Sequence, residues 1–153
     1  MINVSWSIVL PAVLAFAMAS FAPLQTQTPA DQARAFFDEF VRLEQAYDVK
    51  VADLYADDAV IRNKRTYPTG DVREMRFPAA QYKALIRQGM PVAKQRGDRS
   101  AYSRCAYEPV GARVRISCSR YSELKKYTSP YTLVVGPGRS GWLIFEEHSE
   151  SRP

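Results

Sequence analysis

Three residues near the C-terminus carry side chains that could perform acid–base chemistry. Glu146 and His148 are two residues apart in the strand-like segment 142–149, and Tyr131 begins the strand-like segment 131–135. Alternate residues of a strand share a face, and a neighbouring carboxylate orients an imidazole for proton transfer. We therefore regard Tyr131, Glu146 and His148 as candidate catalytic residues. The alternatives are a core tyrosine with a satisfied hydroxyl and a solvated histidine.

The pairing of these two segments decides which side chains meet. A turn centred between Gly138 and Arg139 would place Tyr131 opposite Glu146, with alternate positions of both strands on one face. That face would be apolar at one end and polar at the other, as ligand pockets often are. Its members would be Tyr131, Leu133, Trp142, Ile144, Glu146 and His148. The alternative for Trp142 is an ordinary core residue.

Cys105 and Cys118 are the two cysteines, and the segment between them is typical of a β-hairpin. Segments 101–108 and 113–121 are strand-like, with a Pro-Val-Gly-Ala turn between them. A turn centred just after Gly111 places the two thiols opposite each other, near disulfide distance. Because the chain has no Cys-x-x-Cys motif and a single histidine, we expect neither a redox nor a zinc role. We expect a structural disulfide; two small buried thiols are the alternative.

Residues 6–22 form an uncharged, apolar run that ends in small side chains. The run is slightly short for a membrane span of about 20 residues and contains two A-x-A-like sites, which favours a cleaved signal peptide. We expect cleavage after Ala19 and a periplasmic or secreted bacterial protein. The first basic residue is Arg34, so the positive start of a typical signal is missing. An uncleaved membrane anchor and a cytoplasmic protein are the alternatives.

Composition indicates one globular domain. The 153 residues are 46% hydrophobic and 12% aromatic, which excludes a disordered chain. Residues 28–59 hold eight acidic and three basic residues, whereas residues 60–153 hold eighteen basic and eight acidic residues. An acidic helix attracted to a basic sheet would explain this division; an anionic ligand or surface is the alternative. Nucleic acid is not expected, because the basic residues are dispersed through strands.

Periodicity and capping signals predict three helices. Thr28 can cap the first and Asp48 a short second one, and the third begins at Pro78 and is broken or ended at Gly89 and Pro91.

No phosphate-binding loop, dinucleotide fingerprint or zinc motif is present, so we expect no cofactor and no metal.

Strands are expected at residues 59–65 and 72–77, followed by the cysteine hairpin and the two C-terminal strands. Helices at the front and middle with consecutive strands afterwards indicate an α+β domain with a mostly antiparallel sheet. This domain would span residues 29–150, after a signal peptide at 1–19 and a linker at 20–28.

Three features resemble the nuclear transport factor 2-like superfamily, which includes SnoaL-like and ketosteroid-isomerase-like proteins. The first is Asp-Leu-Tyr-Ala-Asp-Asp-Ala-Val at residues 53–60, where a short helix meets the first strand. The second is the element order, and the third is the closing strand, which begins Gly-Trp-Leu-Ile-Phe at residue 141. The resemblance implies a cystatin-like roll, in which three helices pack on a curved sheet of about six strands.

The resemblance also implies a pocket on the concave face of the sheet, to which Ile61, Asn63 and Arg120 would contribute, and homodimerisation through the outer face. The catalytic base of ketosteroid isomerases falls at Asn63, an amide that cannot abstract a proton. Residues 38–40 lack the tyrosine of their oxyanion hole. Ketosteroid isomerase activity is therefore not expected.

These features lead to a hypothesis with two alternatives. We expect an exported, non-catalytic protein that binds a small apolar or anionic ligand or serves as an assembly module. The first alternative is a small isomerase, dehydratase or cyclase that uses Tyr131, Glu146, His148 and Asn63. The second is a membrane-anchored periplasmic scaffold, like the domain of this fold in type IV secretion machinery.

Overall fold

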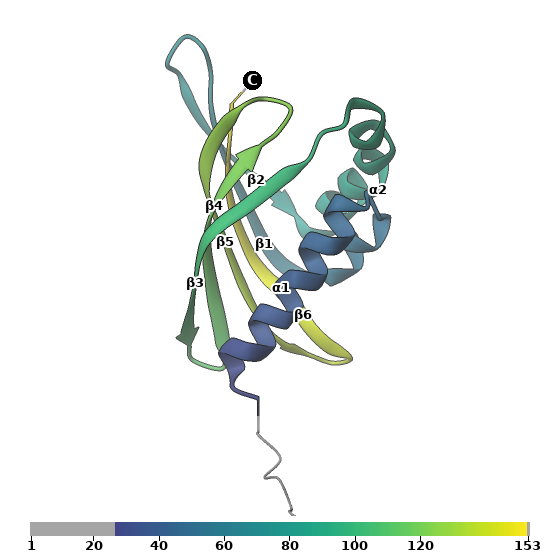
Figure 1. Cartoon of the computed structure of the whole chain (residues 1–153), viewed down its shortest axis with the longest axis vertical. Helices are drawn as coiled ribbons and strands as arrows, with labels where there is room; N and C mark the ends of the chain where they lie inside the picture. The colour runs from purple at the N-terminus through teal and green to yellow at the C-terminus, as the bar shows by residue number, and fades with distance from the viewer. Residues whose placement is uncertain (1–26, 153) are drawn as a thin grey trace, which may run out of the picture.

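The computed structural model describes residues 27–152, in which helices lie on a curved sheet (Figure 1). Helix α1 spans Pro29–Gln45, a 3₁₀ helix spans Val49–Leu54, and α2 spans Ala79–Arg96. Within residues 27–152, the number and order of the helices agree with the prediction. The predicted signal peptide, its cleavage after Ala19 and all but the end of the linker lie outside the described residues.

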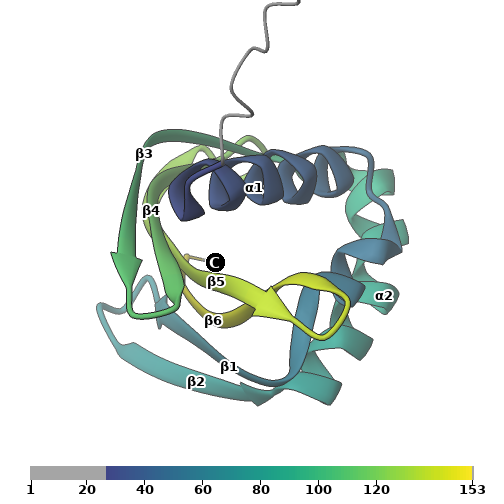
Figure 2. The same ribbon diagram turned by 90° about the horizontal axis from the view of Figure 1, so that it is seen from below.

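Six strands form one sheet in the spatial order β2-β1-β6-β5-β4-β3. Strands β1 and β6 run parallel, and all other neighbours are antiparallel, as expected for this α+β class. Figure 2 shows the sheet curving around its concave face, with α1 lying over that face and α2 beside the β1–β2 end. The strands are β1 Tyr55–Thr66, β2 Val72–Pro78, β3 Ser100–Val110, β4 Arg113–Ser122, β5 Tyr127–Gly138 and β6 Gly141–Ser151.

Helix α1 begins with a capping box, as Thr28 predicts. The Thr28 hydroxyl accepts a hydrogen bond from the backbone N–H of Asp31, and the Asp31 carboxylate accepts one from the backbone N–H of Thr28. The helix then buries Phe37, Phe40 and Leu43 against the concave face of the sheet. This packing fixes the direction in which the C-terminal turn of α1 points.

The prediction that Gly89 and Pro91 break the third helix is wrong. Helix α2 continues through Pro91 and ends at Gly97, whose φ of +62° is the left-handed conformation that caps a helix. Pro91 cannot donate to the carbonyl one turn earlier, but it is exposed, so water can satisfy that carbonyl. The proline is therefore tolerated within the helix.

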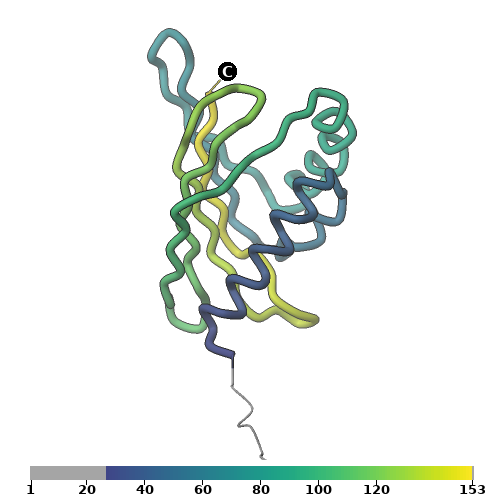
Figure 3. The backbone as a smooth tube through the Cα atoms, viewed as in Figure 1, coloured from purple at the N-terminus to yellow at the C-terminus, as the bar shows by residue number. Residues whose placement is uncertain are grey.

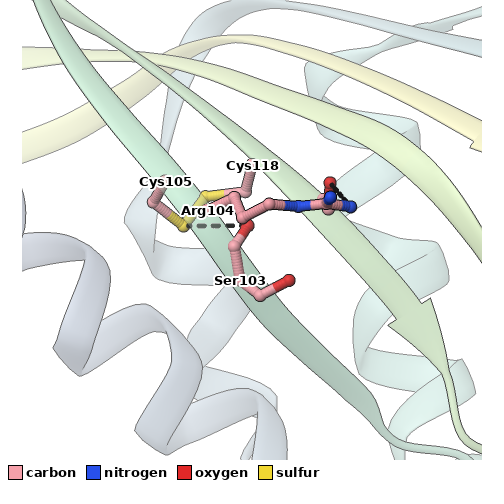
Figure 4. The surroundings of a disulfide bond; sticks show 5 residues. Ser103, Arg104, Cys105 and Cys118 are labelled. Atoms are coloured by element: carbon pink, nitrogen blue, oxygen red, sulfur yellow. Dashed lines mark hydrogen bonds between the residues drawn. A yellow bond between two sulfur atoms is a disulfide. The ribbon is translucent and has the colours of Figure 1, made fainter.

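The cysteine hairpin has the predicted register near its turn, where Glu108 pairs with Arg115. A β-bulge follows at Arg104, whose φ is +53°. Cys105 and Cys118 nevertheless meet in a disulfide between β3 and β4, as Figure 4 shows. The prediction of this disulfide is confirmed.

The predicted pairing of β5 with β6 is wrong. The turn pairs Gly138 with Gly141, and a bulge at Phe145 shifts the register again, so that Leu133 faces Glu147. A one-residue shift moves every side chain beyond it to the other face of the sheet. Glu147, not Glu146, therefore points into the concave side.

Candidate functional site

The candidate catalytic residues do not form one cluster. Tyr131 is buried on the concave face, where its ring lies 5.3 Å from that of Tyr102. Glu146 and His148 lie on the outer face, with side chains 44% and 42% exposed and 3.6 Å apart. The bulge at Phe145 is the reason, because it reverses the face that Glu146 and His148 occupy.

Most of the predicted pocket residues are tightly packed. Ile61, Leu133 and Ile144 are core residues with at most 1% exposure, and Trp142 is half-buried against that core. The Asn63 amide donates to Ser149 Oγ at 2.9 Å and accepts from Ser151 Oγ at 2.8 Å, so it ties β1 to β6. Of the predicted set, Arg120 lines an open pocket.

A buried carboxylate, absent from the prediction, lies in the middle of the domain. Glu147 is 2% exposed and accepts hydrogen bonds from the hydroxyls of Tyr55 on β1 and Tyr82 on α2. Burial, followed by the Glu147 charge, raises the pKa of both tyrosines well above the usual value. Both phenols therefore stay protonated as donors.

The open pocket lies between the C-terminal ends of α1 and α2, the β4–β5 connection and the last residues of the chain. Figure 3 shows these segments at one end of the molecule. The pocket encloses about 340 Å³, and we call it the Arg120 pocket. Its charged lining residues are Glu44, Asp98, Arg120, Lys125 and Arg152, and Tyr47 and Tyr127 add aromatic surface.

Arg120 is fixed from three sides. It faces Tyr102 across the β3–β4 pair, its Nη2 donates to the Glu150 carbonyl at 2.7 Å, and its guanidinium carbon lies 5.3 Å from the centre of the Tyr131 ring. Its Nε is buried and has no hydrogen-bond partner within residues 27–152. The Arg120 guanidinium is therefore held in place, and its Nε–H is a hydrogen-bond donor without an acceptor in the described residues.

Glu44 supplies the matching acceptor. It lies in the last turn of α1, and its Oε2 is likewise buried without a hydrogen-bond partner in the described part of the chain. Burial raises the pKa of Glu44 to about 7, while hydrogen bonding by Tyr102 and the charge of Arg120 oppose this rise. Near neutral pH this carboxyl is thus present in both protonation states.

The described residues contain no cluster of three or more His, Cys, Asp or Glu side chains that could hold a metal ion. Within the same residues, no helix is both long and apolar enough to cross a membrane.

Solved structures show that the chain has the nuclear transport factor 2-like (NTF2-like) fold. An NTF2-like protein of unknown function from Shewanella oneidensis MR-1 has a TM-score of 0.61 and 14% identity, over 81% of this chain and 100% of that one. The yeast UBP3-associated protein BRE5 has a TM-score of 0.60 and 14% identity, over 80% and 95%. No family model and no curated protein matches the sequence.

A candidate dehydratase of the NTF2-like family from Streptomyces avermitilis has a TM-score of 0.56 and 14% identity, over 78% of this chain and 94% of that one. The fold thus occurs in proteins of different kinds, and identity this low indicates the fold alone. Function must therefore be argued from the Arg120 pocket.

Proposed function

We propose that the protein binds a small polar molecule in the Arg120 pocket, without transforming it, in an oxidising compartment outside the cytoplasm. A cavity of about 340 Å³ is in the range of small-molecule sites. The disulfide Cys105–Cys118 supports the choice of compartment, because disulfides persist where thiols are not kept reduced.

One observation carries the proposal. An acceptor, Glu44 Oε2, and a donor, Arg120 Nε, both lack partners in the wall of the same pocket. A buried polar group without a partner costs about 1–3 kcal/mol. A molecule with an acceptor for Arg120 and a polar group that hydrogen-bonds Glu44 could offset both costs after small side-chain shifts, because the Glu44 carboxyl accepts when ionised and donates when protonated. An apolar molecule could offset neither.

Native mass spectrometry of protein purified from its own host, without reductant, tests this function. We expect one small molecule per chain, lost in Arg120→Met and retained in Arg96→Met, an exposed arginine outside the pocket. Circular dichroism would confirm that both variants are folded. A wild-type protein that stays empty even after incubation with deproteinised host extract would refute the proposal.

The pKa of Glu44 favours a second candidate function, proton transfer at the bound molecule. A carboxyl with a pKa of about 7 is suited to act as a general base or acid at neutral pH, and the Arg120 charge could stabilise an oxyanion. The test is whether the co-purified molecule is converted by the wild type and recovered unchanged from Glu44→Gln. This candidate does not use Glu146 or His148. Homodimerisation and a scaffold role stay predictions.

A further inference from the structure

Three cations surround the Arg120 pocket without an acidic partner. Arg120 lies in its wall, Lys125 lies in the β4–β5 connection, and Arg152 follows β6. None of the three forms a salt bridge within residues 27–152, whereas Lys64, Lys83 and other cations elsewhere do. The three cations are therefore not neutralised by salt bridges, and they outnumber the two acidic lining residues, Glu44 and Asp98.

The two outer cations have their backbones fixed at the pocket. The backbone N–H of Arg152 donates to the Tyr127 hydroxyl at 3.1 Å, and the Arg152 guanidinium carbon lies 5.6 Å from the centre of the Tyr127 ring. The backbone N–H of Lys125 donates to the Ser122 hydroxyl at 3.1 Å. The backbones of both residues are thus held in place at the pocket, so ligand binding there requires less ordering of the chain.

We propose that the ligand of the Arg120 pocket is a small organic anion, whose carboxylate or phosphate group binds Arg120 and is flanked by Lys125 and Arg152. This inference rests on the proposed function and adds the ligand's chemistry. The planar guanidinium suits either oxyanion, because it can offer two parallel N–H donors. Two acidic groups, Glu44 and Asp98, also line the pocket.

Glu44 is compatible with an anion because it can be neutral. The groups that face it are Ser100 and Tyr102 on β3, Arg120 on β4 and the Glu147 carboxylate on β6. A second negative charge beside Glu44 favours its protonated form, which then donates a hydrogen bond to the anion. Asp98 lies after α2 on an exposed segment, where solvent screens its charge.

Anion binding therefore takes up a proton at Glu44. Below the pKa of Glu44 the carboxyl is already neutral, so binding needs no proton and is strongest. Above that pKa the carboxylate must first be protonated, so the apparent affinity falls as pH rises. A cationic ligand would show the opposite dependence, because the ionised carboxylate would attract it.

Isothermal titration of the full chain with four small probes tests the proposal. The probes are succinate, methyl phosphate, the neutral succinamide and the cation 1,4-diaminobutane. We expect saturable binding of succinate or methyl phosphate and no binding of succinamide or 1,4-diaminobutane. Which of the two anions binds more tightly shows whether the natural ligand carries a carboxylate or a phosphate. For the variants Lys125→Ala and Arg152→Ala we expect affinity about threefold weaker each, the size typical of exposed charges. The matched control Arg96→Ala should be unchanged.

The pH series uses succinate in two buffers of different ionisation enthalpy. We expect affinity to fall between about pH 6 and pH 8, with proton uptake that is absent in Glu44→Gln. Binding of 1,4-diaminobutane alone would overturn the anion proposal while leaving a ligand pocket in place. Failure of both anions to bind at about 10 mM would also overturn it. The native mass spectra test separately whether the pocket binds any small molecule. Failure of the anion proposal can therefore be distinguished from failure of the proposed function.

Discussion

The Tyr82 hydroxyl on α2 donates a 2.8 Å hydrogen bond to the carboxylate of Glu147 on β6, and Tyr55 on β1 donates to the same carboxylate. The buried carboxylate of Glu147 on β6 thus links its own strand to the parallel strand β1 and to helix α2. The two donors face Glu147 from different elements, so the carboxylate cannot be removed without leaving buried hydroxyls unpartnered.

Glu147→Ala is expected to lower the free energy of unfolding by about 3 kcal/mol or more, because two buried donors lose their acceptor and a cavity remains. Glu146→Ala, its neighbour on the outer face, should change stability by less than about 0.5 kcal/mol. Urea unfolding of both variants measures the difference. Equal effects would contradict the burial of Glu147 and the exposure of Glu146.

The disulfide Cys105–Cys118 closes a short loop, with a sequence separation of 13. For a loop of this size, cross-linking of the unfolded chain stabilises the fold by about 3 kcal/mol. Reduction should therefore lower the urea midpoint of the wild type, and the double variant Cys105→Ser, Cys118→Ser should show the lower midpoint with and without reductant. An unchanged midpoint after complete reduction would contradict this expectation.

Glu44 makes stability depend on pH. Folding raises its pKa from 4.5 to about 7, so its ionisation opposes folding: the cost is absent below about pH 4.5, grows up to about pH 7 and is constant above. Relative to the wild type, Glu44→Gln should therefore gain up to about 3 kcal/mol in free energy of unfolding between pH 5 and pH 8. Glu39→Gln, an exposed carboxylate of the same helix, should show no such gain. A pH-independent difference for Glu44→Gln would contradict the raised pKa.

Gly89 within α2 and Gly97, which caps the C-terminus of α2, should respond in opposite ways to alanine. Gly89 is exposed within the helix, and a Cβ there would meet nothing within 4 Å, so Gly89→Ala should stabilise by about 0.5–1 kcal/mol. Gly97 has the left-handed φ of +62°, so Gly97→Ala should destabilise by about 1 kcal/mol. Thermal unfolding of the two variants gives both signs. Destabilisation by Gly89→Ala would indicate that α2 ends earlier.

The sequence was sufficient for the α+β order and for the disulfide, because both depend on local periodicity. The pairing of Cys105 with Cys118 follows from counting back from the turn, and the bulge at Arg104 does not separate them. The same counting failed for β6, since a bulge at Phe145 has no clear sequence signal and reverses the parity of every later residue. Glu147 was therefore missed and Glu146 chosen.

The position of Glu44 in the helix is a sequence signal from which its burial could have been predicted. It lies four residues after Phe40 and seven after Phe37, so it borders the buried face of α1. This position on the helix distinguishes Glu44 from the acidic residues of α1 that face solvent. That Glu44 and Arg120 line the same pocket could not be foreseen, because their proximity depends on how α1 crosses the sheet.

The most direct test of the ligand pocket is to map binding on the ¹⁵N-labelled protein by NMR, with deproteinised host extract as the probe. Chemical-shift changes should concentrate at Ser100, Ser122, Lys125 and Tyr127, which line the Arg120 pocket. The same titration of Arg120→Met should leave these signals unchanged. Changes confined to residues outside this pocket, or no changes with wild-type protein, would show that the Arg120 pocket is not the binding site.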